Sequence, residues 1–244
     1  MKRKLKIEIG LAVLLLLIAL FGSFLAPYDP LKVNYDFSLQ PPSFLHIFGT
    51  DKLGRDVFSR ILCGAKTSFG LTFLMLFLIV FIGMIVGLIA GLSNDKVESF
   101  FNNIINGLLA FPDTIFAIAI VGIVGAGLFN TVFALALIWW TKYARLTLAL
   151  VKQEKKKNYL VISKMSGVPP LQRIIRYLLP NILSQILVTA FLDIGNMMIS
   201  LAGLSFLGLA SQPPQPEWGA MLYASGSLDD VFSRACFIYL CAYF

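Results

Sequence analysis

Long uncharged runs of apolar residues constrain the fold of this chain more than any other feature. Three such runs cover residues 9–26, 68–92 and 114–141, with lengths of 18, 25 and 28 residues. A helix needs roughly 20 apolar residues to cross a bilayer. Only 14% of the 244 residues are charged and 58% are hydrophobic, whereas a soluble domain carries about 25% charged residues. We therefore expect an all-α, polytopic membrane protein with about six transmembrane helices and no sizeable soluble domain.

Turn signals within the apolar regions divide them into the expected spans. Phe111-Pro-Asp113 interrupts the third span early, and the glycines of Gly125–Asn130 separate it from the fourth. We expect transmembrane helices at 9–26, 68–92, 104–129, 131–151 and 181–210, with a cytoplasmic tail at 1–8, an extracytoplasmic segment at 27–67, a cytoplasmic loop at 152–180, an outer loop at 211–230 and a partial sixth span at 231–244.

The two ends of the chain carry signals of different kinds. Met1–Lys6 before an apolar run is typical of a secretory signal, but this run exceeds about 7–15 residues and Pro27 follows it directly, so we expect a retained first span. Ala235–Phe244 supplies only ten apolar residues, about half of what a crossing needs. We expect an incomplete last helix and a C-terminus that is cut short.

The second expected span carries small residues at a helical interval. Gly83, Gly87 and Gly91 are four residues apart, so they share one face of a helix. Small residues on one face of a membrane helix let a second helix approach closely. We therefore expect this face to pack against another helix.

The net charge of +7 is concentrated in two places. Residues 152–180 contain seven Lys or Arg residues against Glu154 alone, and the N-terminal tail is also basic. Such segments stay in the cytoplasm and are attracted to anionic membrane lipid. We therefore expect a multi-pass protein of the cytoplasmic membrane with its N-terminus inside, and no binding to nucleic acid. Cys63, Cys236, Cys241 and the single His46 lack the spacing of a zinc site, so no metal site or cofactor is expected.

The basic loop contains two expected helices with a break between them. Gly167 stands where a first helix would end, and Pro169 and Pro170 suit the first turn of a second. In this second helix the apolar residues form a stripe opposite Gln172, Arg173 and Arg176; they are Leu171, Ile174, Ile175, Leu178 and Leu179. The periodicity fits equally a surface that docks another protein and a helix that lies flat on lipid headgroups.

Two opposite charges fall at membrane depth. Lys142 and Asp193 lie 11 and 12 residues inside their spans, which is ~17 Å at 1.5 Å per residue. Charges at this depth face a water-filled path or pair with each other. One hypothesis is a translocation path lined by Asp193, Asn196 and the thioethers of Met197 or Met198, with Lys142 as the partner of Asp193. The other is a salt bridge between packed helices, with both methionines as core residues.

Several motifs resemble one family. Gly167, Leu179 and Pro180 match the coupling loop of ABC importer permeases, although Val161-Ile-Ser163 stands where that loop has Glu-Ala-Ala. His46–Arg60 resembles the signature before the second span in the dipeptide, oligopeptide and nickel branch. Further matches to this branch are Leu204–Leu209 and Pro216–Met221; Gly122–Asn130, Tyr143–Arg145, Leu192–Met198 and Ala202–Phe206 are most similar to its nickel permeases of the C type.

The resemblance implies an ABC importer permease fold with cytoplasmic coupling helices. It implies a transport subunit for nickel, free or chelated, with di- or oligopeptides as the alternative cargo. The implied partners are a second permease subunit, two cytoplasmic ATPase subunits and an extracytoplasmic substrate-binding protein. The residues implied to contact an ATPase are Ser163, Gly167, Val168, Pro169, Pro170 and Leu171.

Two other classes of membrane protein compete with this interpretation. Gly64-Ala-Lys-Thr67 lacks the glycine spacing of a phosphate-binding loop, so ATP hydrolysis belongs to a partner. A membrane-embedded hydrolase needs a Ser/His pair or an HExxH motif within the spans, but His46 lies in the outer segment. A channel or secondary transporter would work without an ATPase, and a co-purifying ATPase would exclude it.

Overall fold

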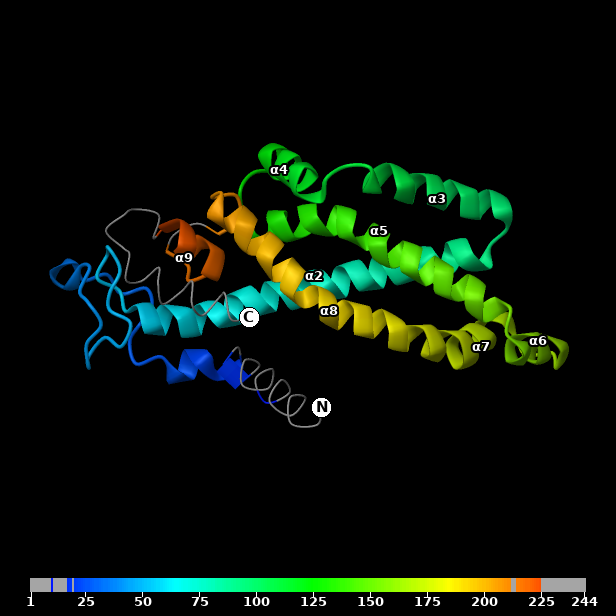
Figure 1. The fold of residues 1–244 in the computed structure, drawn as a ribbon, viewed down its shortest axis with the longest axis horizontal. Helices are drawn as coiled ribbons and strands as arrows, with labels where there is room; N and C mark the ends of the chain where they lie inside the picture. Colours follow the sequence, from blue (N-terminus) through cyan, green and yellow to red (C-terminus); the bar gives the residue numbers. More distant parts are fainter. Residues whose placement is uncertain (1–9, 11–16, 19, 212–213, 225–244) are drawn as a thin grey trace. The chain divides into compact units, whose positions relative to one another are not determined.

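The computed structural model describes residues 10, 17–18, 20–211 and 214–224 of the chain. The described residues are helical, apart from loops and one isolated bridge between Thr50 and Asp56. Figure 1 shows the order of the elements, which are the 3-10 turn η1 (Tyr35–Phe37), α2 (Val57–Leu92), α3 (Asp95–Leu109), α4 (Asp113–Val124), α5 (Leu128–Lys155), α6 (Asn158–Met165), α7 (Pro170–Arg173), the π-helical turn η2 (Ile174–Leu178), α8 (Leu179–Phe206) and α9 (Trp218–Ala224).

Three described helices are long and apolar enough to cross a membrane. They are α2, α5 and the continuous stretch Pro170–Phe206, and a fourth crossing is formed if the bent pair α3 and α4 is counted as one span. Of the expected first span, only residues 10, 17–18 and 20–26 are described. The expected tail at 1–8 and the expected partial span at 231–244 lie outside the described residues.

The first described crossing helix begins earlier than expected. The sequence predicted a span from residue 68, after an extracytoplasmic segment at 27–67, but α2 is continuous from Val57. Asp56 explains this start, because its Oδ2 accepts hydrogen bonds from the backbone N–H of Ser59 at 2.8 Å and from the Ser59 hydroxyl at 2.6 Å. This is an N-cap, and no proline follows to end the helix before Leu92.

The expected third span, 104–129, is two helices. α3 ends at Leu109 and α4 begins at Asp113, with a bend of 86° between them. Pro112 lies at this break, and its ring and missing N–H oppose a continuous helix. A second break separates α4 from α5, where Gly125 has a φ of +102°, a conformation that suits glycine.

The fifth expected span and the outer loop also differ from the sequence prediction. α8 covers Leu179–Phe206 and continues directly from α7 and η2, so no loop separates the second helix of the basic loop from the span. The expected outer loop, 211–230, contains α9. Glu217 caps α9, since its carboxylate accepts hydrogen bonds from the backbone N–H groups of Gly219 at 3.0 Å and Ala220 at 2.8 Å.

The contacts divide the chain into two compact units. The first comprises Met1–Thr72, Gly125–Thr131 and Met198–Phe244, and the second comprises Phe73–Val124 and Val132–Met197. In the first unit, polar side-chain contacts connect the segment before α2 to the start of that helix. His46 Nδ1 lies 2.9 Å from Asp56 Oδ1, and Arg60 donates a hydrogen bond to the carbonyl of Pro30 at 2.9 Å. The candidate site lies in the second unit.

Candidate functional site

Helix α5 is placed in the second unit by close packing against α2. A Cβ atom added at Gly83, Gly87 or Gly91 would lie within 2.7 Å of α5 atoms, the nearest being Tyr143 Cβ, Thr147 Cβ and Val151 Cγ1 respectively. Real side chains do not approach this closely, so only glycine allows this helix spacing. The small-residue face of α2 therefore fixes the position of the α5 residues that carry charge.

Lys142 on α5 and Asp193 on α8 form an ion pair. Lys142 Nζ donates to both carboxylate oxygens of Asp193, at 2.8 and 2.7 Å. The Tyr143 hydroxyl donates to Asp193 Oδ2 at 2.9 Å. Asp193 is buried, whereas half of the Lys142 side chain surface is exposed. The pair is therefore covered on one side by the chain itself and open on the other.

Polar residues on α8 continue from this pair along the helix. Asn181, Gln185, Thr189, Asp193 and Asn196 follow at i, i+4, i+8, i+12 and i+15, which places them on one side of α8. We call these five residues the polar seam. Asn181, Gln185 and Asn196 are exposed. A helix that faced only lipid or packed core would not repeat polar residues at this interval.

The two methionines of the candidate path differ in burial. Met197 is completely buried, together with Ile186, Ala190 and Leu201 on the packed side of α8. It is one helical turn beyond Asp193 but on the side that contacts the chain's own residues. This burial is what the second hypothesis, with the methionines as core residues, predicts for Met197. Met198 is partly exposed.

Two further polar contacts connect α5 to α3, and the sequence analysis missed both. Arg145 Nη2 donates to Asn106 Oδ1, and Lys152 Nζ contacts Glu98 Oε1. Figure 1 shows α3 running beside α5, where these contacts form. A signal was present, because Lys142, Arg145 and Lys152 share one face of α5, and Glu98, Asn102 and Asn106 are four residues apart on α3.

The basic loop folds into two helices with a defined corner. Gly167 ends α6 with a φ of +76°. The N–H of Val168 donates to the Ser163 carbonyl at 3.2 Å, and the N–H of Gly167 donates to the Lys164 carbonyl at 3.2 Å. This is a Schellman motif, which favours glycine at its left-handed position. Pro170 then occupies the first turn of α7. The helix–glycine–proline–helix pattern predicted from the sequence is therefore present.

The apolar stripe predicted for the second helix is divided. Leu171 and Ile175 are 68% and 57% exposed, whereas Leu178 is 1% exposed. The cause is η2, a π-helical turn, which adds a residue to the turn and rotates the following residues about the axis. Leu178 therefore packs into the unit, while Leu171 and Ile175 stay on the surface.

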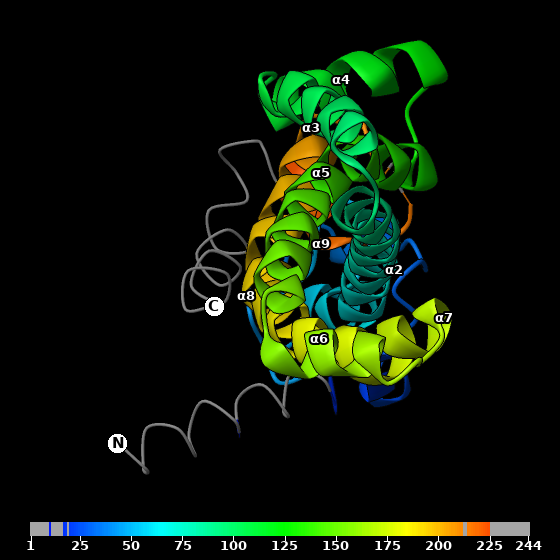
Figure 2. The ribbon, with the colours of Figure 1, turned by 90° about the vertical axis from the view of Figure 1, so that its right-hand side faces the viewer.

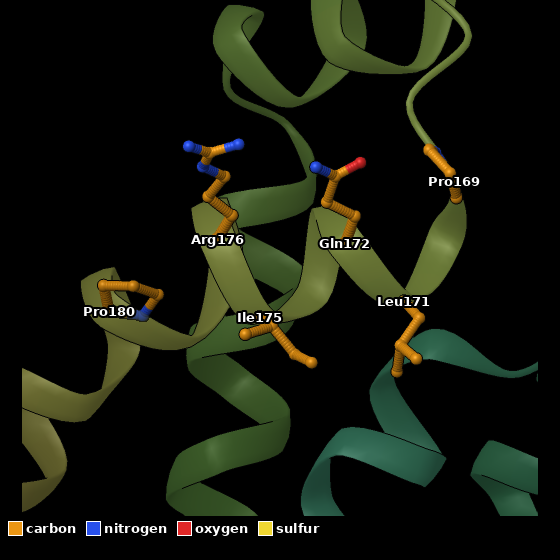
Figure 3. Close-up of a pocket in the computed structure, with 6 residues that line it drawn as sticks. All are labelled: Pro169, Leu171, Gln172, Ile175, Arg176 and Pro180. Atoms are coloured by element: carbon orange, nitrogen blue, oxygen red, sulfur yellow. The ribbon is translucent and has the colours of Figure 1, made fainter.

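A shallow groove lies along α7 and η2. Its volume is about 680 Å³. In Figure 3, Leu171 and Ile175 point to one side of the helix, and Gln172 and Arg176 point to the other. The lining residues are Pro169, Leu171, Gln172, Ile175, Arg176 and Pro180.

The Ser163 side chain is buried. It is 6% exposed, and its hydroxyl donates to the carbonyl of Leu160 at 2.8 Å. The expected contact of Ser163 with an ATPase stays a prediction, and its side chain hydrogen-bonds within α6. Met165, in the last turn of the same helix, is 82% exposed and was missed.

A polar cluster connects α6, the first helix of the basic loop, to the end of α5 and the start of α8. The Glu154 carboxylate contacts Lys157 Nζ and accepts a hydrogen bond from the Tyr159 hydroxyl, which accepts one from Asn181 Nδ2 at 3.1 Å. Burial and the neighbouring Glu154 carboxylate raise the pKa of Tyr159 to about 12. Figure 2 shows α6 and α7 at the end of the unit where α5 ends and α8 begins.

Among the described residues, no group of three His, Cys, Asp or Glu side chains lies close enough together to hold a metal ion. The polar groups of the second unit that carry the argument below are the ion pair, the polar seam and the Arg145–Asn106 contact.

Two family models match the sequence. Residues 83–241 match the model described as binding-protein-dependent transport system inner membrane component. Residues 9–42 match the model described as the N-terminal TM domain of oligopeptide transport permease C.

Three curated relatives span most of the chain. The di/tripeptide transport system permease protein DppC of Pseudomonas aeruginosa (strain UCBPP-PA14) is 39% identical over 94% of this chain and 77% of its own length. The nickel transport system permease protein NikC of Escherichia coli (strain K12) is 35% identical over 86% of this chain and 76% of its own. The glutathione transport system permease protein GsiD of Shigella flexneri serotype 5b (strain 8401) is 39% identical over 86% of this chain and 70% of its own.

The fold is similar to that of a solved transporter. A chain of the MetNI methionine ABC transporter, in an inward-facing conformation, matches with a TM-score of 0.60 at 20% identity, covering 74% of this chain and 88% of that chain. This likeness shows the ABC transporter permease fold that the sequence analysis expected.

Proposed function

This chain belongs to the family of binding-protein-dependent transport system inner membrane components and is therefore a membrane permease of an ABC importer, and we propose that its cargo is nickel, as the free ion or as a chelate. The sequence features that support nickel are the stretches 122–130, 143–145 and 192–198, which resemble nickel permeases. Di- and oligopeptides are the second candidate cargo, because two of the relatives are named for peptide transport.

We propose that the corner between α6 and α7 contacts an ATPase subunit. Gly167, Val168, Pro169, Pro170 and Leu171 form this corner. The exposed apolar side chains of Leu171 and Ile175 along the shallow groove carry the proposal, because exposed apolar surface rimmed by polar residues marks protein interaction sites. The Glu154 cluster then connects this corner to α5 and α8, so a displacement of the corner is passed to both helices.

The proposed cargo path runs along the polar seam and the Lys142–Asp193 pair. An exposed polar side at membrane depth needs water or a polar partner, and a transport path supplies water. The proposed assembly contains this chain, a second permease subunit, two cytoplasmic ATPase subunits and an extracytoplasmic substrate-binding protein. ATP binding and release would favour different conformations in turn, so the path opens to one side and then to the other.

The experiment is uptake in cells that lack this chain and are complemented with it. We expect complementation to restore uptake of radioactive nickel, and the Gly167→Asp variant to abolish it while the amount of the chain in the membrane stays normal. The physical reason is that a carboxylate is added at an exposed left-handed corner where the ATPase would dock.

Gly167→Asn is the matched control, because asparagine has the size of aspartate, tolerates the left-handed conformation and has no charge. We expect the Asn variant to retain more uptake than the Asp variant. If Gly167→Asp still couples ATP hydrolysis to transport, the corner is not the docking contact. If complementation restores dipeptide uptake and not nickel uptake, the cargo is the second candidate.

A further inference from the structure

Arg145 is a cation within a membrane-crossing helix. It lies ten residues before Lys155 on α5, which is about 15 Å along the helix axis from that end. A hydrocarbon core of ~30 Å centred on this helix includes that position. Arg145 is also one helical turn from Lys142 and on the same side of α5, so the two cations are neighbours.

The three cations on this side of α5 have different partners. Lys142 pairs with Asp193, and Lys152 pairs with Glu98. Arg145 donates instead to the side-chain carbonyl of Asn106, which is neutral. No described residue forms an ion pair with Arg145. Among the described residues, one positive charge is therefore left without an ion-pair partner at this depth.

Arginine cannot remove this charge by losing its proton, because its guanidinium stays protonated in proteins. A cation at this depth must therefore face water or an anion. The Arg145 side chain is exposed, and so is Asn106. A guanidinium matches the geometry of a carboxylate, to which it can donate two parallel hydrogen bonds.

We propose that Arg145 binds a carboxylate group of the cargo as the cargo passes along the path. The proposal rests on the proposed function, since it assigns a cargo class to the same path. The carboxylate has two possible sources: the C-terminus of a peptide, or a carboxylate chelator that surrounds nickel. A bare nickel ion would meet the Arg145 guanidinium, which lacks an ion-pair partner among the described residues, as a like charge, so the importer moves nickel only in chelated form.

The test is the uptake of labelled probes by cells that express this chain with its importer partners. The probes are Ni²⁺ as chloride in chelator-free buffer, Ni²⁺ with excess citrate, and the dipeptide Ala-Ala, with Ala-Ala amide as a competitor that lacks the carboxylate. We expect uptake of Ni²⁺–citrate or of Ala-Ala, no uptake of Ni²⁺ alone, and no competition by the amide. The probe that enters identifies the source of the carboxylate.

Two variants separate cargo binding from helix packing. Arg145→Gln removes the charge, and we expect a rise of about tenfold in the KM for the imported probe, the size of one lost charge-assisted contact. Asn106→Asp keeps the guanidinium but supplies a carboxylate beside it. If Arg145 only holds α3 to α5, this variant gains an ion pair and transports normally. If Arg145 binds cargo, the new carboxylate competes with it, and the KM rises as in Arg145→Gln.

The outcomes that overturn the inference differ from those that overturn the proposed function. Uptake of Ni²⁺ alone at the rate seen with citrate overturns the carboxylate inference and supports nickel as cargo. An unchanged KM in both variants also overturns the inference. Uptake of Ala-Ala with a raised KM in both variants supports the inference and contradicts nickel. Uptake of none of the probes contradicts both, and the Gly167 variants then test the ATPase contact separately through ATP hydrolysis.

Discussion

At the scale of single residues, Asp193 supplies the counter-ion for Lys142, a cation at membrane depth. Its carboxylate is buried and accepts hydrogen bonds from Lys142 and Tyr143. Replacing Asp193 with Asn leaves Lys142 without a counter-ion. We expect a loss of about 1–3 kcal/mol in the free energy of unfolding, between the values for exposed and buried pairs, because Lys142 is half exposed. Thermal unfolding of the detergent-solubilised complex measures this loss.

A double variant separates the structural role of the pair from a role in transport. Lys142→Met with Asp193→Asn removes both charges and should recover the thermal stability lost in the single variant. If the pair lines the path, uptake stays low in the double variant, because neither charge is present to contact cargo. Uptake at the normal rate would instead show that the pair only joins two packed helices.

At the scale of elements, the contact between α2 and α5 sets the geometry of the site. A Cβ at Gly87 would lie 2.5 Å from Thr147 Cβ and 2.6 Å from the carbonyl oxygen of Ala144. Gly87→Ala should therefore separate the helices and destabilise the chain by about 1–3 kcal/mol. Gly122→Ala on α4 is the control, because a Cβ there meets nothing within 4 Å. Equal melting temperatures for the two variants would contradict the close packing.

Element boundaries show what the sequence could predict and what it could not. Glycine spacing on α2, the Gly167 corner and the proline after it are local signals, and each has a local consequence in the structure. The continuous start of α2 depends on the Asp56 cap, a contact that the apolar run at 68–92 does not indicate. The π-helical turn at 174–178 has no local sequence signal, and it divided the apolar stripe that simple periodicity predicted.

In the candidate site, too, some residues have a local sequence signal and others are found only from tertiary contacts. Lys142 and Asp193 stood out because each is a charge inside an apolar run. Arg145 was missed because it follows Lys142 so closely that it was read only as part of a family motif. Its partner Asn106 is 39 positions away, on a helix whose position depends on the bend at Pro112. Contacts of this kind follow from tertiary packing, which a single sequence does not reveal.

At the scale of the whole molecule, the distribution of charge predicts which side of the membrane each segment faces. The loop at 152–180 holds seven Lys or Arg residues and one Glu, so it is expected in the cytoplasm, and the segment at 27–67 is expected outside. Single cysteines test this after the three native cysteines are replaced with serine. Phe44→Cys and Lys156→Cys are suitable, because both positions are exposed.

In intact cells, a membrane-impermeant maleimide should label the cysteine at position 44 and not the one at position 156. Both should be labelled once the membrane is opened, which controls for reactivity. The expected difference has an electrostatic cause, because basic segments are retained on the cytoplasmic side, where the leaflet is anionic. Labelling of position 156 in intact cells would show that the chain has the opposite orientation in the membrane. It would also place the Gly167 corner on the side of the membrane where no cytoplasmic ATPase can reach it.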